Sequence, residues 1–211
     1  MKIIFLGKPG SGKGTYAQML SEEFGIPKFV AGDLLRKEVR GKTKLGKLIA
    51  GYIDKGNLAP AEIVVKLMEK NIKNKKDFII DGFPRSLEQL NLFSERKIRI
   101  DVVFYLNCSD EEVIKRLINR RTCIKCNKVY NLVTNPPKEE GKCDVCGGKL
   151  VIRKDETKEG IKQRLKVYKK ETLPVIEYYR KKGILVEING NKPINVVYKK
   201  IKSYLKNLNL I

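Results

Sequence analysis

Short apolar runs alternate along the chain with longer stretches in which apolar residues recur every three or four positions. The short runs predict buried strands, and the periodic stretches predict amphipathic helices. The predicted strands are Lys2–Leu6, Lys28–Val30, Phe78–Asp81, Asp101–Leu106 and Ile184–Ile188. The predicted helices are Gly14–Phe24, Asp33–Val39, Leu45–Lys55, Pro60–Asn71, Ser86–Arg96, Asp110–Arg120, Lys158–Lys181 and Pro193–Leu208. This alternation predicts an α/β fold with a five-stranded parallel sheet, helices on both faces, and ligands at the carboxyl ends of the strands.

One stretch, from about residue 121 to 152, has no helical period. It contains four cysteines, the pair Pro136-Pro137 and three glycines. We interpret it as a small inserted subdomain that lies outside the core sheet.

Composition narrows the possible chemistry. Of 211 residues, 42% are hydrophobic and 33% charged, which is typical of a globular chain with one main core. No apolar run is long enough to span a membrane, and the segment from Met1 to Leu6 is too short for a signal peptide, so a cytoplasmic location without membrane partners is expected. The chain has no histidine, which excludes Ser-His-Asp and Cys-His nucleophiles and histidine-bound metals. A metal must therefore be bound by cysteine or carboxylate.

The chain is strongly basic. It carries 45 Lys and Arg against 24 Asp and Glu, a net charge of +21. Such a charge attracts phosphate-bearing partners, either nucleic acid or nucleotides. Lysines occur in nearly every segment, whereas only 11 residues are arginine, the side chain suited to bidentate phosphate binding. The positions of the arginines are therefore informative.

A glycine-rich loop follows the first predicted strand. Residues 7 to 15 read Gly-Lys-Pro-Gly-Ser-Gly-Lys-Gly-Thr. Glycines let successive N–H groups face a phosphate, the next helix begins with its positive end there, and Lys13 can reach the outer phosphates. The strict motif has Ser or Thr directly after the lysine, but here Gly14 intervenes before Thr15. With this departure the loop resembles the phosphate loop of nucleoside monophosphate kinases.

Two further motifs follow predicted strands. Phe78–Asp81 is an apolar strand that ends in a carboxylate, a common element for positioning Mg²⁺ in nucleotide sites. It continues as Asp81-Gly82-Phe83-Pro84-Arg85, which resembles a signature of adenylate kinases. Gly32-Asp33-Leu34-Leu35-Arg36 after the second strand adds to this resemblance, which covers essentially the whole chain.

The resemblance implies a P-loop fold with two attached parts. The core would comprise residues 1–30, 57–120 and 155–211. A helical acceptor-binding subdomain would occupy residues 31–73, overlapping the core boundary, and a zinc-binding lid would occupy residues 121–154.

The resemblance also implies roles for individual residues. ATP would be bound by Gly10, Ser11, Gly12, Lys13, Gly14, Thr15, Arg120, Val129, Tyr130 and Lys192. AMP would be bound by Ala31, Arg36, Asn57, Leu58, Ala59, Gly82, Phe83, Pro84, Arg85, Gln89, Arg153 and Arg164. The catalytic residues would be Lys13, Arg85, Arg116, Arg120, Arg153 and Arg164, and Asp81 and Thr15 would hold Mg²⁺ through water. Arg116 and Arg120 are expected to share one face of a helix, four residues apart.

The cysteines of the insert form a second pattern. Cys123 and Cys126, then Cys143 and Cys146, have the spacing of a structural zinc site with four thiolates. Disulfides are the alternative, which a reducing compartment disfavours. Cys108 has no partner in the motif and is expected to be a small buried residue.

We therefore interpret the chain as an adenylate kinase: Mg²⁺-dependent, reversible transfer of a phosphoryl group from ATP to AMP, with one structural Zn²⁺. The resemblance implies a monomer, and no nucleic-acid partner is expected. One alternative is a kinase with UMP or CMP as acceptor. Another is a zinc-ribbon protein that binds nucleic acid, which the net charge and the cysteines could also suggest.

Overall fold

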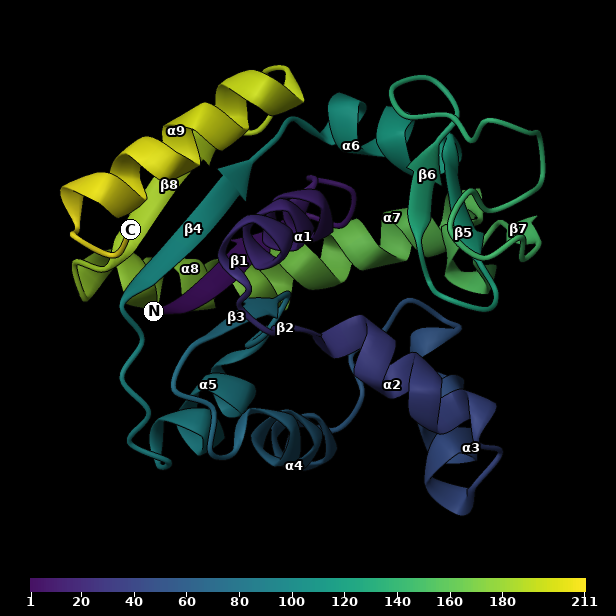
Figure 1. Cartoon of the computed structure of the whole chain (residues 1–211). Helices are drawn as coiled ribbons and strands as arrows, with labels where there is room; N and C mark the ends of the chain where they lie inside the picture. Colours follow the sequence, from purple (N-terminus) through teal and green to yellow (C-terminus); the bar gives the residue numbers. More distant parts are fainter.

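A computed structural model describes all 211 residues, and its centre is a parallel sheet with strand order β2-β3-β1-β4-β8 (Figure 1). The strands are β1 (Lys2–Gly7), β2 (Lys28–Val30), β3 (Phe78–Asp81), β4 (Val102–Asn107) and β8 (Leu185–Asn189). All five predicted strands, and the predicted sheet, are therefore confirmed.

Side chains alternate between the two faces of each strand, and this alternation builds two hydrophobic layers. Ile3 and Phe5 of β1 belong to a layer covered by α1 (Lys13–Phe24) and α9 (Ile194–Asn207). Ile4 and Leu6 belong to the opposite layer, covered by α4 (Ala61–Ile72), α5 (Leu87–Ser94) and α8 (Leu173–Lys181). The sheet thus has helices on both faces, as predicted.

Two helices extend away from this core toward the lower right of Figure 1. They are α2 (Ala31–Arg40) and α3 (Lys44–Ile53), which pack on each other. They form the first part of the segment, residues 31–73, for which the sequence predicted an acceptor-binding subdomain, and α4 lies in its second part.

The inserted segment forms a sheet of its own, with strand order β6-β5-β7. Its strands are β5 (Arg120–Cys123), β6 (Val129–Asn131) and β7 (Leu150–Val151), all paired antiparallel. The insert lies beyond one end of the central sheet, on the side of α2 and α3 (Figure 1). A hydrogen bond from Arg40 Nη1 to Asn127 Oδ1, 3.1 Å long, joins it to α2.

The predicted helix Asp110–Arg120 is too long. Helix α6 (Asp110–Ile118) ends two residues earlier, and Arg120 begins β5, where it pairs with Asn131. The expectation that Arg116 and Arg120 share a helix face is therefore wrong, because antiparallel pairing draws Arg120 out of the helix.

The predicted helix Lys158–Lys181 forms, but it is not uniform. It consists of α7 (Lys158–Val167), a π-helical turn (Tyr168–Thr172) and α8. Together these segments run along the central sheet to the insert (Figure 1).

None of the helices combines the length and the hydrophobicity that a membrane-spanning segment needs.

Candidate active site and lid

The glycine-rich loop joins β1 to α1 in the conformation that the motif predicts. Gly7, Gly10 and Gly12 all have positive φ angles, of 146°, 81° and 92°. A Cβ at residue 7 would lie 2.6 Å from the carbonyl oxygen of Leu106, so only glycine fits there. No side chain caps the N-terminus of α1, whose N–H groups can therefore bind a phosphate.

Lys13 lies folded over this loop. Its Nζ donates to the carbonyl oxygens of Gly7 (2.9 Å) and Lys8 (2.7 Å). Burial lowers the pKa of Lys13 to about 8, although the carboxylate of Asp81 opposes the shift. An anion bound at the loop would add the counter-charge that this ammonium lacks.

Asp81, at the end of β3, lies beside the start of α1. A Cβ at residue 14 would lie 3.0 Å from Asp81 Oδ2, so Gly14 lets the carboxylate come close to the helix. Burial raises the pKa of Asp81, while Lys13 and Arg85 oppose the rise. Carboxylate oxygen is a ligand type that Mg²⁺ accepts, directly or through water, so the donor set fits the predicted metal. Thr15, its predicted partner, is exposed at the same turn.

Arg85, which the sequence predicts to bind the acceptor, is held tightly in the loop after β3. Its backbone N–H donates to Gln89 Oε1 (2.8 Å), and its Nε donates to the carbonyl oxygen of Gly82 (2.6 Å). Burial and the neighbouring charge of Arg164 lower the pKa of Arg85 to about 10. Gln89, predicted to contact the acceptor, is almost fully buried and supports the main chain of Arg85.

Arg85, Arg120, Arg153 and Arg164, which we call the arginine cluster, come from four separate segments. Burial, followed by the charges of Arg153 and Arg164, holds the pKa of Arg120 well below its usual value. Burial and the charge of Arg36 lower that of Arg153 to about 10. These guanidinium groups are crowded together and poorly hydrated, an arrangement that favours binding of phosphate groups.

Two carboxylates that the sequence analysis missed compensate this charge. Glu156, whose side chain is fully buried, forms an ion pair with Arg120 and lies 3.5 Å from Arg164 Nη1. Asp155 lies 2.9 Å from the same nitrogen. In the sequence they belong to the charged run Arg-Lys-Asp-Glu, which looks like a solvated surface segment. The only available signal was their position directly after Arg153.

The other two predicted arginines, Arg36 and Arg116, have separate partners. Arg36 forms an ion pair with Asp33, 2.5 Å long, at the start of α2. Arg116 Nη2 donates to the carbonyl oxygen of Gly190 (2.9 Å), and its Nη1 lies 3.5 Å from that of Ser11. Arg116 therefore joins the phosphate loop to the loop that carries the exposed Lys192, apart from the arginine cluster.

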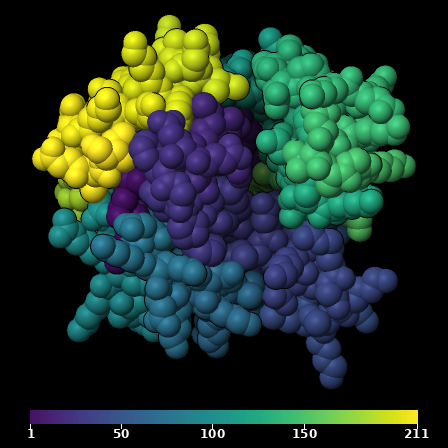
Figure 2. Space-filling model, viewed as in Figure 1, coloured from purple at the N-terminus to yellow at the C-terminus, as the bar shows by residue number.

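Three predicted acceptor residues line a hollow of about 820 Å³. Asn57, Leu58 and Ala59 contribute to its wall, together with residues of α3, α4 and α7, but no arginine does. Ala31 is buried at the start of α2. Gly82, Phe83 and Pro84 follow β3, and the Phe83-Pro84 peptide bond is cis. Figure 2 shows the molecule hollowed between the start of α1, the insert and α2.

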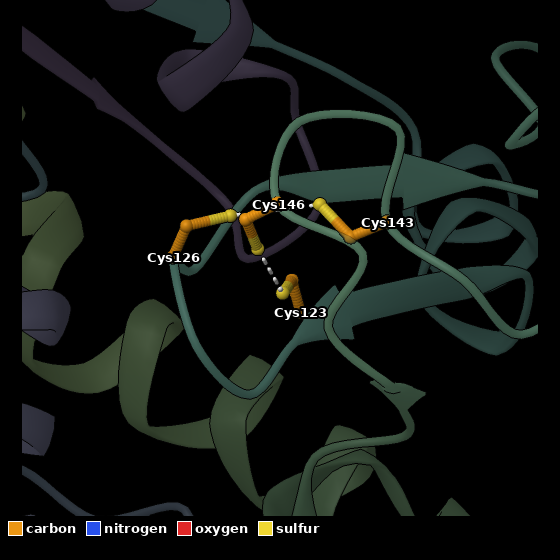
Figure 3. Close-up of side chains that lie close together, drawn as sticks. All are labelled: Cys123, Cys126, Cys143 and Cys146. Atoms are coloured by element: carbon orange, nitrogen blue, oxygen red, sulfur yellow. Dashed lines mark hydrogen bonds between the residues drawn. The ribbon is translucent and has the colours of Figure 1, made fainter.

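The four cysteines of the insert, which we call the thiol cluster, converge at one point (Figure 3). All Sγ atoms lie within 4.8 Å of one another, and the Cys123–Cys146 and Cys126–Cys143 pairs are 3.5 Å apart. They are free thiols, so the disulfide alternative does not hold. Sulfurs around a tetrahedral zinc with bonds of about 2.3 Å are about 3.8 Å apart, so this spacing fits zinc.

Tyr130, predicted to cover the donor base, has its ring inside the insert. Its hydroxyl accepts from the N–H of Asp144 (2.9 Å) and lies 3.4 Å from Cys143 Sγ. Burial opposes ionisation of Cys143, but hydrogen bonds from Tyr130 and from backbone N–H groups outweigh it and lower the pKa of that thiol to about 6. Only the backbone of Tyr130, with the exposed side chain of Val129, remains for a base contact.

A phosphate loop at the end of a parallel sheet, with clustered arginines from the neighbouring segments and the insert, is typical of a P-loop kinase that acts on small phosphorylated substrates. The comparisons with known proteins specify the family. Residues 5–184 match the family model described as "Adenylate kinase". The chain belongs to the adenylate kinase family, and it is a phosphotransferase.

The similarity to curated relatives extends over nearly the whole chain. The chain is 45% identical to an adenylate kinase of Archaeoglobus fulgidus, with 99% of both chains covered. It is 42% identical to one of Petrotoga mobilis (99% of both) and 43% identical to one of Methanosarcina barkeri (98% of this chain, 99% of the relative). The predicted fold and enzyme class are confirmed.

Proposed function

We propose that this chain transfers the terminal phosphoryl group of Mg·ATP to AMP and back, so that ATP and AMP interconvert with two ADP. The observation that carries the proposal is that Lys13, at the start of α1, lies near Asp81 and near Arg85 and Arg164 of the arginine cluster. Phosphoryl transfer needs alignment of two nucleotides, charge neutralisation and exclusion of water, and it needs no covalent intermediate.

On the donor side, the N–H groups of the loop bind the β- and γ-phosphates of ATP, and Lys13 turns its ammonium from the loop carbonyls to these phosphates. Arg116 and Lys192 border the donor base from the loop at Gly190. Mg²⁺, held through water by Asp81 and Thr15, would neutralise phosphate charge during transfer.

On the acceptor side, Arg36 and Arg85 bind the AMP phosphate, and Gln89 contacts the base. Asn57, Leu58 and Ala59 form the neighbouring wall. Arg120, Arg153 and Arg164 stabilise the oxygens of the phosphoryl group in transit. When nucleotide binds, Arg120 and Arg164 exchange Glu156 and Asp155 for these oxygens.

The thiol cluster binds one structural Zn²⁺. All four ligands come from the protein, so no position is left for a reactive water. The hydrophobic cluster of the insert contains only Cys123, Tyr130, Cys143 and Leu150, a core too small to fold without additional bonds. Zinc would supply those bonds.

A coupled phosphotransfer assay tests the proposal with AMP, GMP, CMP and UMP as acceptors and ATP and GTP as donors. ATP with AMP should give the highest kcat/KM. A UMP or CMP optimum would contradict the proposed acceptor.

The proposed partners have tests of their own. Electrophoretic mobility shifts with RNA and DNA at physiological salt should be absent, and light scattering should show a monomer. We also expect a cytoplasmic location.

A further inference from the structure

The π-helical turn Tyr168–Thr172 interrupts the long helix where it passes the acceptor side. The N–H of Leu173 donates to the carbonyl oxygen of Tyr168, five residues earlier, and Pro174, which has no N–H, follows. A π turn adds one residue to a helical turn, is rare, and often occurs at functional sites. It changes the direction of the side chains on that turn.

The hydroxyl of Thr172, in this turn, bonds outside its own helix. A threonine inside a helix commonly donates to a carbonyl of its own preceding turn. Here Thr172 Oγ1 donates instead to the carbonyl oxygen of Arg85, at 2.8 Å, in the loop after β3. Thr172 is only 5% exposed, so water does not replace this bond easily.

The bond completes a set of three that immobilise Arg85. Gln89 accepts from its backbone N–H, Gly82 accepts from its guanidinium Nε, and Thr172 donates to its carbonyl oxygen. Support of this kind matters because the charges of Arg164 and Arg36 repel Arg85 when no phosphate is bound.

We infer that Thr172 is a positioning residue for the AMP phosphate: its hydroxyl, turned outward by the π segment, fixes the main chain of Arg85. This inference rests on the proposed acceptor role of Arg85. Loss of the hydroxyl would leave a buried carbonyl without its donor and let the guanidinium move. Since one neutral hydrogen bond is involved, Thr172→Val should raise the KM for AMP about threefold to tenfold. The KM for ATP should change by less than about twofold.

Matched variants separate positioning from general stability. Thr172→Ser keeps a hydroxyl and should restore the KM for AMP to within about twofold of wild type. Tyr168→Phe removes another hydrogen bond of the same π turn, the 3.2 Å contact with Tyr105, without touching Arg85. It should leave the KM for AMP unchanged. If Thr172→Val does not fold, Thr172→Ala provides the same comparison.

The reference variant is Arg85→Ala. If it leaves the KM for AMP unchanged, the proposed role of Arg85 fails, and the inference fails with it. If Arg85→Ala raises this KM but Thr172→Val does not, or if Tyr168→Phe acts like Thr172→Val, only the role of Thr172 is overturned. Equal increases in the KM for AMP and ATP would also overturn it.

Discussion

The arginine cluster and the thiol cluster both gather side chains that repel one another when they are charged, four cations in one case and four potential thiolates in the other. They differ in the groups that compensate this charge. Two of the arginines, Arg120 and Arg164, have Asp155 and Glu156 as resident partners. The thiols lie around a point that their own four sulfurs enclose (Figure 3).

The type of partner determines how each cluster can bind a ligand. Carboxylates that pair with the arginines can be displaced by phosphate groups, so the arginine cluster suits reversible binding and catalysis. A four-thiolate site holds its ion permanently and stabilises the fold. Removing a charge near the phosphates should therefore affect mainly the rate, and removing a thiol should affect mainly stability.

The largest effect is expected for Lys13→Ala. In the proposed reaction its ammonium would neutralise charge on the transferring phosphates, and the loss of one such contact costs about 2.7 to 4 kcal/mol, so kcat should fall at least about 100-fold. The melting temperature should barely change, because the buried ammonium does not stabilise the folded state. Steady-state kinetics and calorimetry check this, with the exposed Lys115→Ala as control. A fall in kcat below tenfold would exclude the proposed role.

Arg120→Ala tests whether the arginine cluster also has a structural part. We expect kcat to fall by a similar factor and stability to fall by up to about 3 kcal/mol, because fully buried Glu156 loses one of its two arginine partners. The double variant Arg120→Ala with Glu156→Gln should recover stability but not kcat. Unchanged stability of the single variant would show that Arg164 alone compensates Glu156.

Arg120 and Glu156 also show where sequence reasoning reaches its limit. The strands and the phosphate loop are encoded locally, in apolar runs and in glycines at positive φ, so they could be predicted. Arg120 was placed in a helix because its strand forms only by pairing with residues 129–131, a tertiary contact. Glu156 was missed because the sequence does not show that this charged run is buried. The prediction that the four cysteines lie together was correct, because two closely spaced pairs of cysteines can be recognised in the sequence itself.

For the thiol cluster we expect about one Zn²⁺ per purified chain by elemental analysis. Cys143→Ser should reduce the metal content and loosen the insert, while the central sheet stays folded. Limited proteolysis should then cut first within residues 121–154. Cys108→Ser, the buried cysteine outside the cluster, should keep the metal. Absence of metal, together with four freely titrating thiols in the native wild type, would contradict the zinc site.

A smaller effect concerns the pH dependence of ATP binding at the phosphate loop. The pKa of Lys13 is about 8 in the protein without nucleotide, and phosphate groups should raise it. Above pH 8, binding of ATP must therefore include uptake of a proton, and the affinity should fall by up to about tenfold per pH unit. Calorimetry at pH 8.5 in buffers of different ionisation enthalpy measures this uptake. Lys13→Arg should abolish it, and the same uptake in that variant would assign the proton elsewhere.

The smallest predicted effect concerns the choice of the acceptor base. Most adenylate kinases have Thr-Gly-Asp after the second strand, whereas this chain has Ala31, buried at the first turn of α2, before Gly32. Without that hydroxyl, Gln89 would have to recognise the base in the proposed reaction while it also supports Arg85. One neutral hydrogen bond is worth about 0.5 to 1.5 kcal/mol, so Ala31→Thr should increase the preference for AMP over GMP, CMP and UMP by about threefold to tenfold in kcat/KM. An unchanged preference would show that position 31 does not take part in base recognition in this chain.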